Sequence, residues 1–272
     1  MDDETNHPFK MISDKPRELT EDDVEKLKKQ TFVSDFKKNK LENEAQKNWD
    51  KFYNRNTDKF FKDRNWSPED VKLLCKDMDF QADLTYLEAG CGVGNMLFPL
   101  AFSYPSLKLQ AFDFSKNAVE MLRKRAAEHN MDVETTVLDL SKPIEVPVFS
   151  RKANFATLIF VMSAIPPEKF ATVVANMKDL MADGGSLLIR DYAINDHAMI
   201  RFGRESKVAD RFYTRQDGTL AYYFELEELV ELFERDGFTC SNKEYLYRRT
   251  INKEKGVNVP RAFVQARLVR NC

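Results

Sequence analysis

The stretch Leu87-Glu88-Ala89-Gly90-Cys91-Gly92-Val93-Gly94 decides the fold, because an apolar run leads into three glycines that alternate with other residues. The run Leu84–Glu88 predicts a buried strand, and Met96–Phe102 predicts a helix directly after the loop. Glycine is needed where a turn is tight and a ligand must approach the backbone without a Cβ in the way. The spacing is GxGxG, not the GxGxxG that grips a pyrophosphate, so the loop predicts a cofactor other than a dinucleotide.

Outward from this loop, short apolar runs alternate with helical segments, which predicts crossover connections and a parallel sheet. The strands that we expect are Leu84–Glu88, Lys108–Phe112, Val133–Val137, Phe155–Val161, Ser186–Arg190, Ser241–Arg248 and Ala262–Val269. The helices that we expect are Met96–Phe102, Asn117–His129, Pro167–Met181 and Leu226–Arg235. We therefore predict a Rossmann-like α/β fold with a seven-stranded, mostly parallel sheet and a C-terminal antiparallel strand pair. Such a terminal pair is typical of class I methyltransferases rather than of dehydrogenases.

The N-terminal part of the chain has a different pattern. Residues 1–20 are polar and predict a flexible tail, whereas residues 21–80 predict a helical extension and residues 81–272 the cofactor-binding domain. Within the extension, Trp49 and Tyr53 lie four residues apart and hence on one helical face. The segment 60–66, with Lys62, Arg64 and Trp66, mixes cations and aromatic rings in a way that suits RNA, although a structural lid would also use them.

Charge and composition exclude several classes of function. A net charge of −2 and an isoelectric point near 6.1 exclude binding of nucleic acid by bulk charge alone. Residues 37–64 nevertheless carry nine bases against five acids, and residues 243–270 eight against two, so a local basic face is expected unless these runs are ordinary solvated surface. Four cysteines without a CxxC pair and three scattered histidines predict no metal site. An acidic start and the lack of a long apolar stretch predict a soluble protein of the cytoplasm or the nucleus, with no membrane contact.

Two acidic residues after predicted strands specify the cofactor further. Asp113 ends the second strand, where a carboxylate can accept both hydroxyls of a ribose. Asp139 comes after the third strand and is placed to accept from an adenine amino group, while Ile159 in the fourth strand can pack on the adenine face. Together with Gly90, Gly92 and Gly94, and with Glu88 to orient the ligand, these residues predict S-adenosylmethionine as cofactor.

The residues at the ends of the fourth and fifth strands indicate the methyl acceptor. The fourth strand runs into Met162-Ser163-Ala164-Ile165-Pro166-Pro167, without the Asp/Asn/Ser-Pro-Pro-aromatic motif of many amine methyltransferases, and no Pro-Cys pair supplies a nucleophile. An acceptor with a free lone pair fits, because it needs no deprotonation. The fifth strand ends in Arg190-Asp191-Tyr192. We expect Asp191 to stabilise the cation that methylation of a ring nitrogen creates and Tyr192 to stack on a base, although Arg190 and Asp191 can also form a structural pair.

The chain resembles the eukaryotic tRNA 3-methylcytidine methyltransferases over roughly residues 20–270. The resemblance is carried by Leu87–Asn95, Phe60–Trp66, Leu158–Ile165, Leu188–Tyr192 and Phe212–Thr219, and residues 46–53 and 196–199 are most similar to the branch that acts on serine tRNA. It implies methylation of cytidine N3 in the anticodon loop, with seryl-tRNA synthetase as a partner. It also implies that Trp49, Tyr53, Gly90, Asp113, Asp139, Leu140 and Ile159 contact the cofactor.

For the RNA side, the resemblance places Arg64, Arg190, Asp191 and Tyr192 at the target base, and we add Lys62, Trp66 and His197 as RNA contacts. We expect a monomer that acts by direct transfer, with the product S-adenosylhomocysteine. Two alternatives remain open at this point: a small-molecule or protein methyltransferase on the same fold, and a non-catalytic RNA-binding module.

Overall fold

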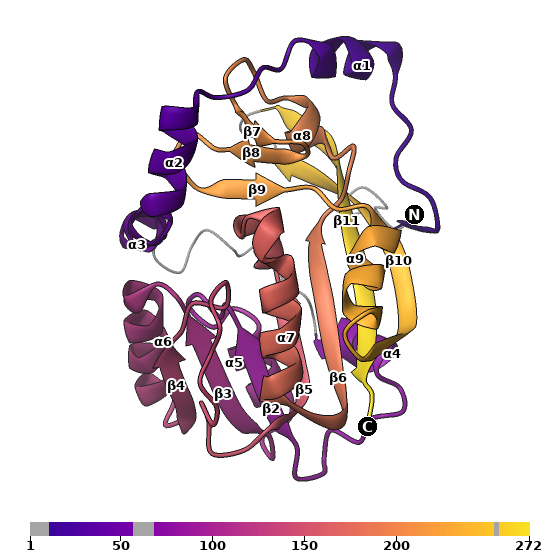
Figure 1. Cartoon of the computed structure of the whole chain (residues 1–272). Coiled ribbons are helices and arrows are strands. Elements are labelled where there is room, and N and C mark those ends of the chain that lie inside the picture. Colours follow the sequence, from indigo (N-terminus) through magenta and orange to yellow (C-terminus); the bar gives the residue numbers. More distant parts are fainter. Residues whose placement is uncertain (1–10, 57–67, 253–255) are drawn as a thin grey trace.

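An eight-stranded sheet forms the centre of the computed structural model, which describes residues 11–56, 68–252 and 256–272 (Figure 1). The strands run in the order β1-β10-β11-β6-β5-β2-β3-β4 across the sheet. Their bounds are β1 Met11–Ser13, β2 Thr85–Ala89, β3 Lys108–Asp113, β4 Val133–Val137, β5 Ala153–Ile159, β6 Met181–Tyr192, β10 Phe238–Asn252 and β11 Val257–Arg270. Strands β2 to β6 pair in parallel, whereas β11 is antiparallel to both β6 and β10. The predicted parallel sheet with a C-terminal antiparallel pair is thus confirmed.

Helices cover both faces of this sheet because its strands are apolar on both sides. In β2, Tyr86 packs into one core and Leu87 into the other, as the two-residue period of a strand requires. One face packs against α7 (Phe170–Leu180) and α9 (Leu226–Glu234). The opposite face packs against α4 (Pro68–Leu74), α5 (Leu97–Ser103) and α6 (Lys116–Glu128). Two short 3-10 turns, η2 (Met162–Ala164) and η3 (Pro167–Lys169), lie between β5 and α7.

The eighth strand corrects the prediction of seven strands and of a flexible tail up to residue 20. Residues Met11–Ser13 pair antiparallel with Tyr245–Tyr247 at the edge of β10. The Tyr247 hydroxyl also donates to the backbone oxygen of Lys15 at 2.7 Å. A three-residue strand has too few residues to show periodicity, and its partner lies more than 230 residues away, so the local sequence carries no signal for it. Residues 1–10 lie outside the described part of the chain.

The N-terminal helices and a second, small sheet lie above the edge at which β6 ends (Figure 1). The helices are α1 (Glu21–Lys28), α2 (Asp35–Asn43) and α3 (Ala45–Asn56), and α8 (His197–Ile200) comes after β6. Thr20 and Ser34 cap α1 and α2 through their hydroxyls. The small sheet consists of β7 (Lys207–Ala209), β8 (Phe212–Thr214) and β9 (Leu220–Tyr222), which the sequence did not predict. Across the described ranges, no helix is both long and apolar enough to cross a membrane.

Candidate active site

The glycine loop between β2 and α5 is built on left-handed backbone. Gly90, Gly92 and Gly94 have φ of 67°, 52° and 77°, a region that residues with a Cβ rarely adopt. A Cβ on Gly90 would overlap a methyl of Val161, and one on Gly92 would lie 2.8 Å from the Tyr53 hydroxyl. The three glycines are therefore required by the turn and by the close approach of neighbouring side chains.

Asp113 links the end of β3 to this loop. Its carboxylate accepts from the backbone N–H of Gly92 and from that of Ser115, both at 2.9 Å. Burial raises the pKa of Asp113 to about 6, although the two backbone hydrogen bonds act in the opposite direction. Each oxygen keeps a second lone pair, so the geometry fits the ribose contact that the sequence predicted.

Asp139 lines a cavity with Leu140 and Asp113, here called the Asp139 cavity. Its walls also include Phe114, Val161 and Ile165. Burial alone would raise the pKa of Asp139, but hydrogen bonds from Lys142 and Ser141 lower it, so this carboxylate is ionised at neutral pH. An ionised acceptor among apolar side chains fits an adenine ring with its amino group.

Ile159 lines a second cavity instead, here called the glycine-loop cavity, together with Glu88 and Gly92. That Ile159 packs on the adenine face stays a prediction. Strand β5 ends at Ile159 because Phe160 has a φ of 58°, and the chain then turns so that Val161 faces the Asp139 cavity. The sequence had extended this strand to Val161, which a positive φ at Phe160 prevents.

Glu88 closes the base of the glycine-loop cavity. One of its oxygens accepts from the backbone N–H of Leu97 at 2.8 Å, at the start of α5. Burial raises the pKa of Glu88 to about 8, with this hydrogen bond partly offsetting it. The carboxyl group, at the end of β2, therefore holds the start of α5.

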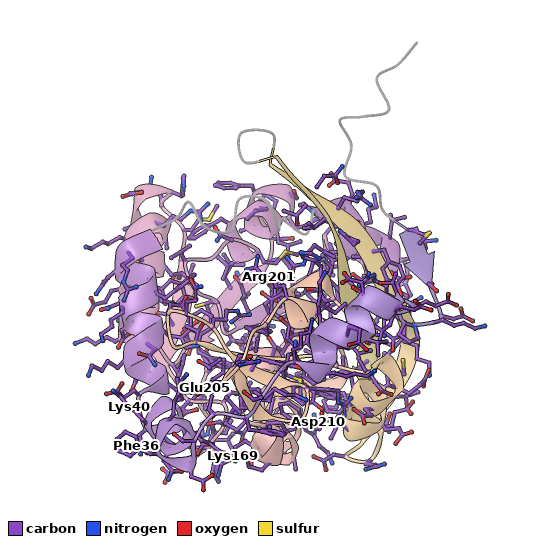
Figure 2. All side chains as sticks on the ribbon, turned by 90° about the horizontal axis from the view of Figure 1, so that it is seen from above. Phe36, Lys40, Lys169, Arg201, Glu205 and Asp210 are labelled. Atoms are coloured by element: carbon purple, nitrogen blue, oxygen red, sulfur yellow. The ribbon has the colours of Figure 1, made fainter. Side chains whose placement is uncertain are left out.

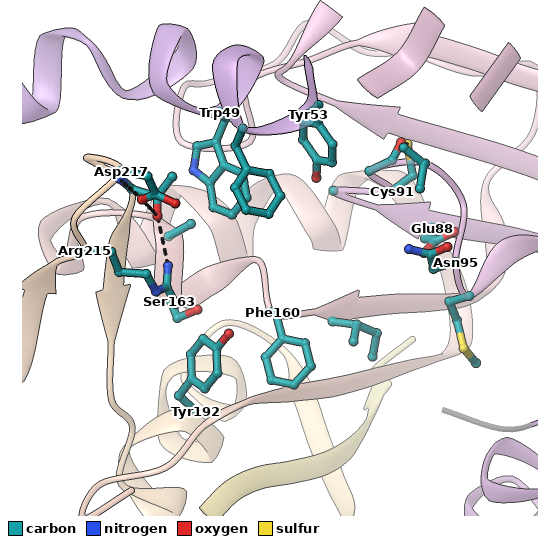
Figure 3. A pocket seen from close by; sticks show the side chains of 18 residues that line it. Trp49, Tyr53, Glu88, Cys91, Asn95, Phe160, Ser163, Tyr192, Arg215 and Asp217 are labelled. Carbon is teal, nitrogen blue, oxygen red and sulfur yellow. Dashed lines mark hydrogen bonds between the residues drawn. The ribbon is translucent and has the colours of Figure 1, made fainter. Parts of the chain in front are cut away.

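Helix α3 covers the loop with aromatic side chains. Trp49 and Tyr53 line both cavities, and their ring centroids are 6.0 Å apart. Figure 3 shows both rings projecting from the helix into the pocket, with Tyr53 nearer to Cys91 and Trp49 nearer to Asp217. Asp50 anchors the helix, because its carboxylate accepts from the Ser115 hydroxyl at 2.5 Å. The two cavities are thus continuous beneath α3, as a cofactor with an adenosine and a methionine end requires.

At the end of β6, Asp191 and Arg190 lie on opposite faces of the strand. Asp191 is fully buried and accepts from the backbone N–H groups of Ser163 (2.9 Å) and Tyr192 (2.8 Å), whose side chains both line the glycine-loop cavity. Burial raises the pKa of Asp191 to about 6. Arg190 instead donates to the side-chain oxygen of Gln265 on β11 and lines none of the three cavities described here. Of the predicted trio, Tyr192 thus lines the cavity and Asp191 is hydrogen-bonded behind it, whereas Arg190 lies on the other face of the strand.

A groove rich in arginine adjoins the glycine-loop cavity and is here called the arginine groove. The cationic residues in its walls are Lys37, Arg201, Arg204, Arg215 and Arg261. His197 also lines it, and burial lowers the pKa of this imidazole, so it is mostly neutral at pH 7. The view from above in Figure 2 looks onto this part of the molecule and labels Arg201.

Sequence reasoning missed several residues that the structure brings to the site. Phe160 packs on Tyr192 with ring centroids 4.8 Å apart, and Arg215 and Asp217 line both the glycine-loop cavity and the arginine groove. The motif Phe212–Thr219 contained the last two, but a motif gives no indication of which cavity a loop faces. The predicted RNA contacts Lys62, Arg64 and Trp66 lie outside the described residues.

This fold and this bipartite cavity define a class I methyltransferase that uses S-adenosylmethionine. A model of the methyltransferase domain matches residues 41–242. A human protein named tRNA N(3)-cytidine methyltransferase METTL6 is 43% identical, over 93% of this chain and 90% of its own. The Schizosaccharomyces pombe tRNA N(3)-methylcytidine methyltransferase trm141 is 35% identical, over 86% of this chain and 95% of its own. The chain therefore belongs to the tRNA N(3)-cytidine methyltransferase family.

A solved structure supports the fold independently. The Burkholderia thailandensis 1,6-didemethyltoxoflavin-N1-methyltransferase, solved with S-adenosylhomocysteine, superimposes with a TM-score of 0.58 and covers 98% of this chain and 97% of its own. Only 14% of its residues are identical, so this likeness shows the fold alone.

Proposed function

We propose that this protein methylates N3 of a cytidine in the anticodon loop of tRNA. One observation carries the proposal: Tyr192, Arg215 and Asp217 line both the glycine-loop cavity and the arginine groove. A nucleotide whose phosphates lie in the groove can therefore reach the cavity with its base. Because N3 lies on the pairing edge, the base must be unpaired or flipped out, and the loop of a tRNA meets that requirement.

The chemistry requires little of the side chains beyond positioning. When bound, S-adenosylmethionine would supply an electrophilic methyl group on its sulfonium for the lone pair of N3. The acceptor nitrogen carries no proton, so no general base is needed. Cys91, the thiol within the glycine loop, is buried, and burial raises its pKa well above the ordinary value, so it is a poor nucleophile.

Different residues of the site bind the cofactor and the target base. Asp113 and Asp139 hold the nucleoside part of the cofactor, and the glycine loop accommodates its methionine part. Tyr192 and Phe160 provide an aromatic surface for the target base. Asp191 fixes the backbone of Ser163 and Tyr192, and its negative charge behind Tyr192 favours the cation that forms on the base.

The proposal also specifies serine tRNA as the substrate and seryl-tRNA synthetase as a partner. They rest on the similarity of residues 46–53 and 196–199 to the branch of the family that acts on serine tRNA. One of these residues, His197, lines the arginine groove. The protein would then act where tRNA is processed, in the cytoplasm or the nucleus. Incubation of purified tRNA isoacceptors with the protein, with and without the synthetase, followed by nucleoside mass spectrometry, tests this. We expect 3-methylcytidine in serine tRNA, more with the synthetase, and equal methylation of all isoacceptors would contradict it.

A further inference from the structure

The tip of the β8–β9 hairpin forms a wall of the glycine-loop cavity on the side of Tyr192 (Figure 3). The tip is held in place by helix α3, because the Asn48 side chain donates to the backbone oxygen of Gly218 at 3.2 Å. Gly218 has a φ of 81°, and a Cβ there would lie 2.8 Å from the Asn48 amide nitrogen. The hairpin tip is thus fixed to the helix that carries Trp49 and Tyr53.

Asp217 presents a fixed acceptor at this tip. Its Oδ1 accepts from the backbone N–H of Thr219 at 3.0 Å and from the Thr219 hydroxyl at 2.7 Å. Its Oδ2 makes no hydrogen bond to any residue that the structure describes. Figure 3 shows the carboxylate beside Trp49, at the wall of the cavity.

Arg215 presents a fixed donor beside it. Its Nη1 donates to the backbone oxygen of Leu220 at 2.8 Å, and its guanidinium carbon lies 5.3 Å from the centre of the Tyr192 ring. Within the described part of the chain, Nε and Nη2 have no hydrogen-bond partner. A donor that lies over the Tyr192 ring and an acceptor two residues further on therefore both line the cavity that the target base is expected to enter.

We propose that Asp217 and Arg215 read the pairing edge of the target base. Asp217 accepts a hydrogen from the exocyclic amine of cytosine, and Arg215 donates to its O2, so that the two side chains hold the base by the groups on either side of N3. Uracil has a carbonyl in place of the amine and a hydrogen on N3, so it would place an oxygen against the Asp217 carboxylate. This inference rests on the proposed function and deepens it, because it names the residues that select cytidine.

A substrate lacking the amine tests Asp217. Anticodon stem-loops would carry either cytidine or the pyrimidin-2-one riboside at the target position, and kcat/KM would be measured for the wild type and for Asp217→Asn. The variant keeps the Oδ1 acceptor for Thr219, so the hairpin is preserved. Loss of the amine should cost the wild type roughly 100-fold more than it costs the variant. The intrinsic difference between the two bases cancels in this comparison, so equal losses would overturn the role of Asp217.

The matching test for Arg215 uses 2-thiocytidine, whose sulfur is a weaker acceptor than O2. The wild type should lose more activity on it than Arg215→Gln does, and equal losses would overturn that contact. Gln216→Ala is the control on the same turn, and its base preference should equal that of the wild type. Calorimetric binding of S-adenosylmethionine to each variant checks that the fold is intact. If the wild-type protein formed no 3-methylcytidine, the proposed function would be overturned as well. If the wild type were active but lost as much activity on the modified bases as the variants do, only the roles of Asp217 and Arg215 would be overturned.

Discussion

The carboxylate of Asp113 accepts a hydrogen bond from the backbone N–H of Gly92 at 2.9 Å, which joins the end of β3 to the centre of the glycine loop. Asp113→Ala removes this link and the acceptor for the ribose together. We expect cofactor affinity to fall at least roughly 100-fold, the usual cost of losing charged hydrogen bonds in a buried site. Calorimetry with S-adenosylmethionine measures this, and unchanged binding would refute the assignment.

The same carboxyl group predicts a pH dependence of cofactor binding. Because the pKa of Asp113 is raised to about 6, the group is ionised above that pH and protonated below it. The ionised form accepts hydrogen bonds with both oxygens, so affinity should fall by up to about tenfold per unit below about pH 6. Asp113→Asn should bind weakly and lose this dependence. A flat profile for the wild type between about pH 5 and pH 8 would contradict the role.

A comparison of Gly92→Ala with Gly184→Ala should distinguish the effect of backbone strain from the effect of a displaced Tyr53. A Cβ at Gly92 would lie 2.8 Å from the Tyr53 hydroxyl, whereas one at Gly184 has nothing within 4 Å, and both glycines have positive φ. Both substitutions should lower stability, by roughly 1–2 kcal/mol. Only Gly92→Ala should weaken cofactor binding, by about tenfold or more, because it displaces Tyr53. Thermal unfolding and calorimetry on both variants decide this, and equal affinities would be inconsistent with a close contact between α3 and the loop.

Asp191→Ala should impair the chemical step more than cofactor binding. The substitution leaves the buried N–H groups of Ser163 and Tyr192 without their acceptor and removes the charge behind the target base. We expect the single-turnover rate to fall roughly 100- to 1000-fold, as for other losses of preorganised electrostatic groups. Asp183→Ala, at the exposed start of the same strand, is the matched control and should behave as the wild type. Full activity of Asp191→Ala would exclude the role proposed for this carboxylate.

The arginine groove should determine how tRNA binding depends on salt. Replacing Arg201 and Arg204 by Gln should lower the slope of log affinity against log salt concentration by about one to two, since each lost phosphate contact contributes a little under one unit. Lys124→Gln on α6, whose side chain is exposed and lines none of the three cavities described here, is the control. Titrations at several salt concentrations measure the slopes. If the double variant and the control had the same slope, the groove would not be a path for the RNA backbone.

The cofactor half of the site could be predicted because it is local in sequence. A strand, a tight turn and a helix are adjacent in the chain, and parallel strands bring Asp113 and Asp139 to the same edge as the loop. The strand Val133–Val137 has the predicted bounds, and the strand at residues 84–88 is shifted by one residue.

The acceptor half could not be predicted in the same way, because it is assembled from distant segments. Arg190 and Asp191 are adjacent in sequence, yet the pleat of β6 places their side chains on opposite faces. Arg190 donates to Gln265, and Asp191 accepts from the backbone N–H of Ser163. Asp217 lies on a hairpin tip that Asn48, about 170 residues earlier in the chain, holds against α3. The strand at Met11–Ser13 likewise depends on a partner at the other end of the chain. Local patterns cannot encode such contacts.

The most direct test of the central claim is to trace the methyl group itself. The protein would be incubated with S-adenosylmethionine that carries a trideuterated methyl group and with a tRNA transcript, and the digested nucleosides would be analysed by mass spectrometry. We expect the label in 3-methylcytidine, and its disappearance when the anticodon-loop cytidine is replaced by uridine. Label in another nucleoside, or none in the tRNA while a small molecule or protein is methylated, would contradict the proposed function.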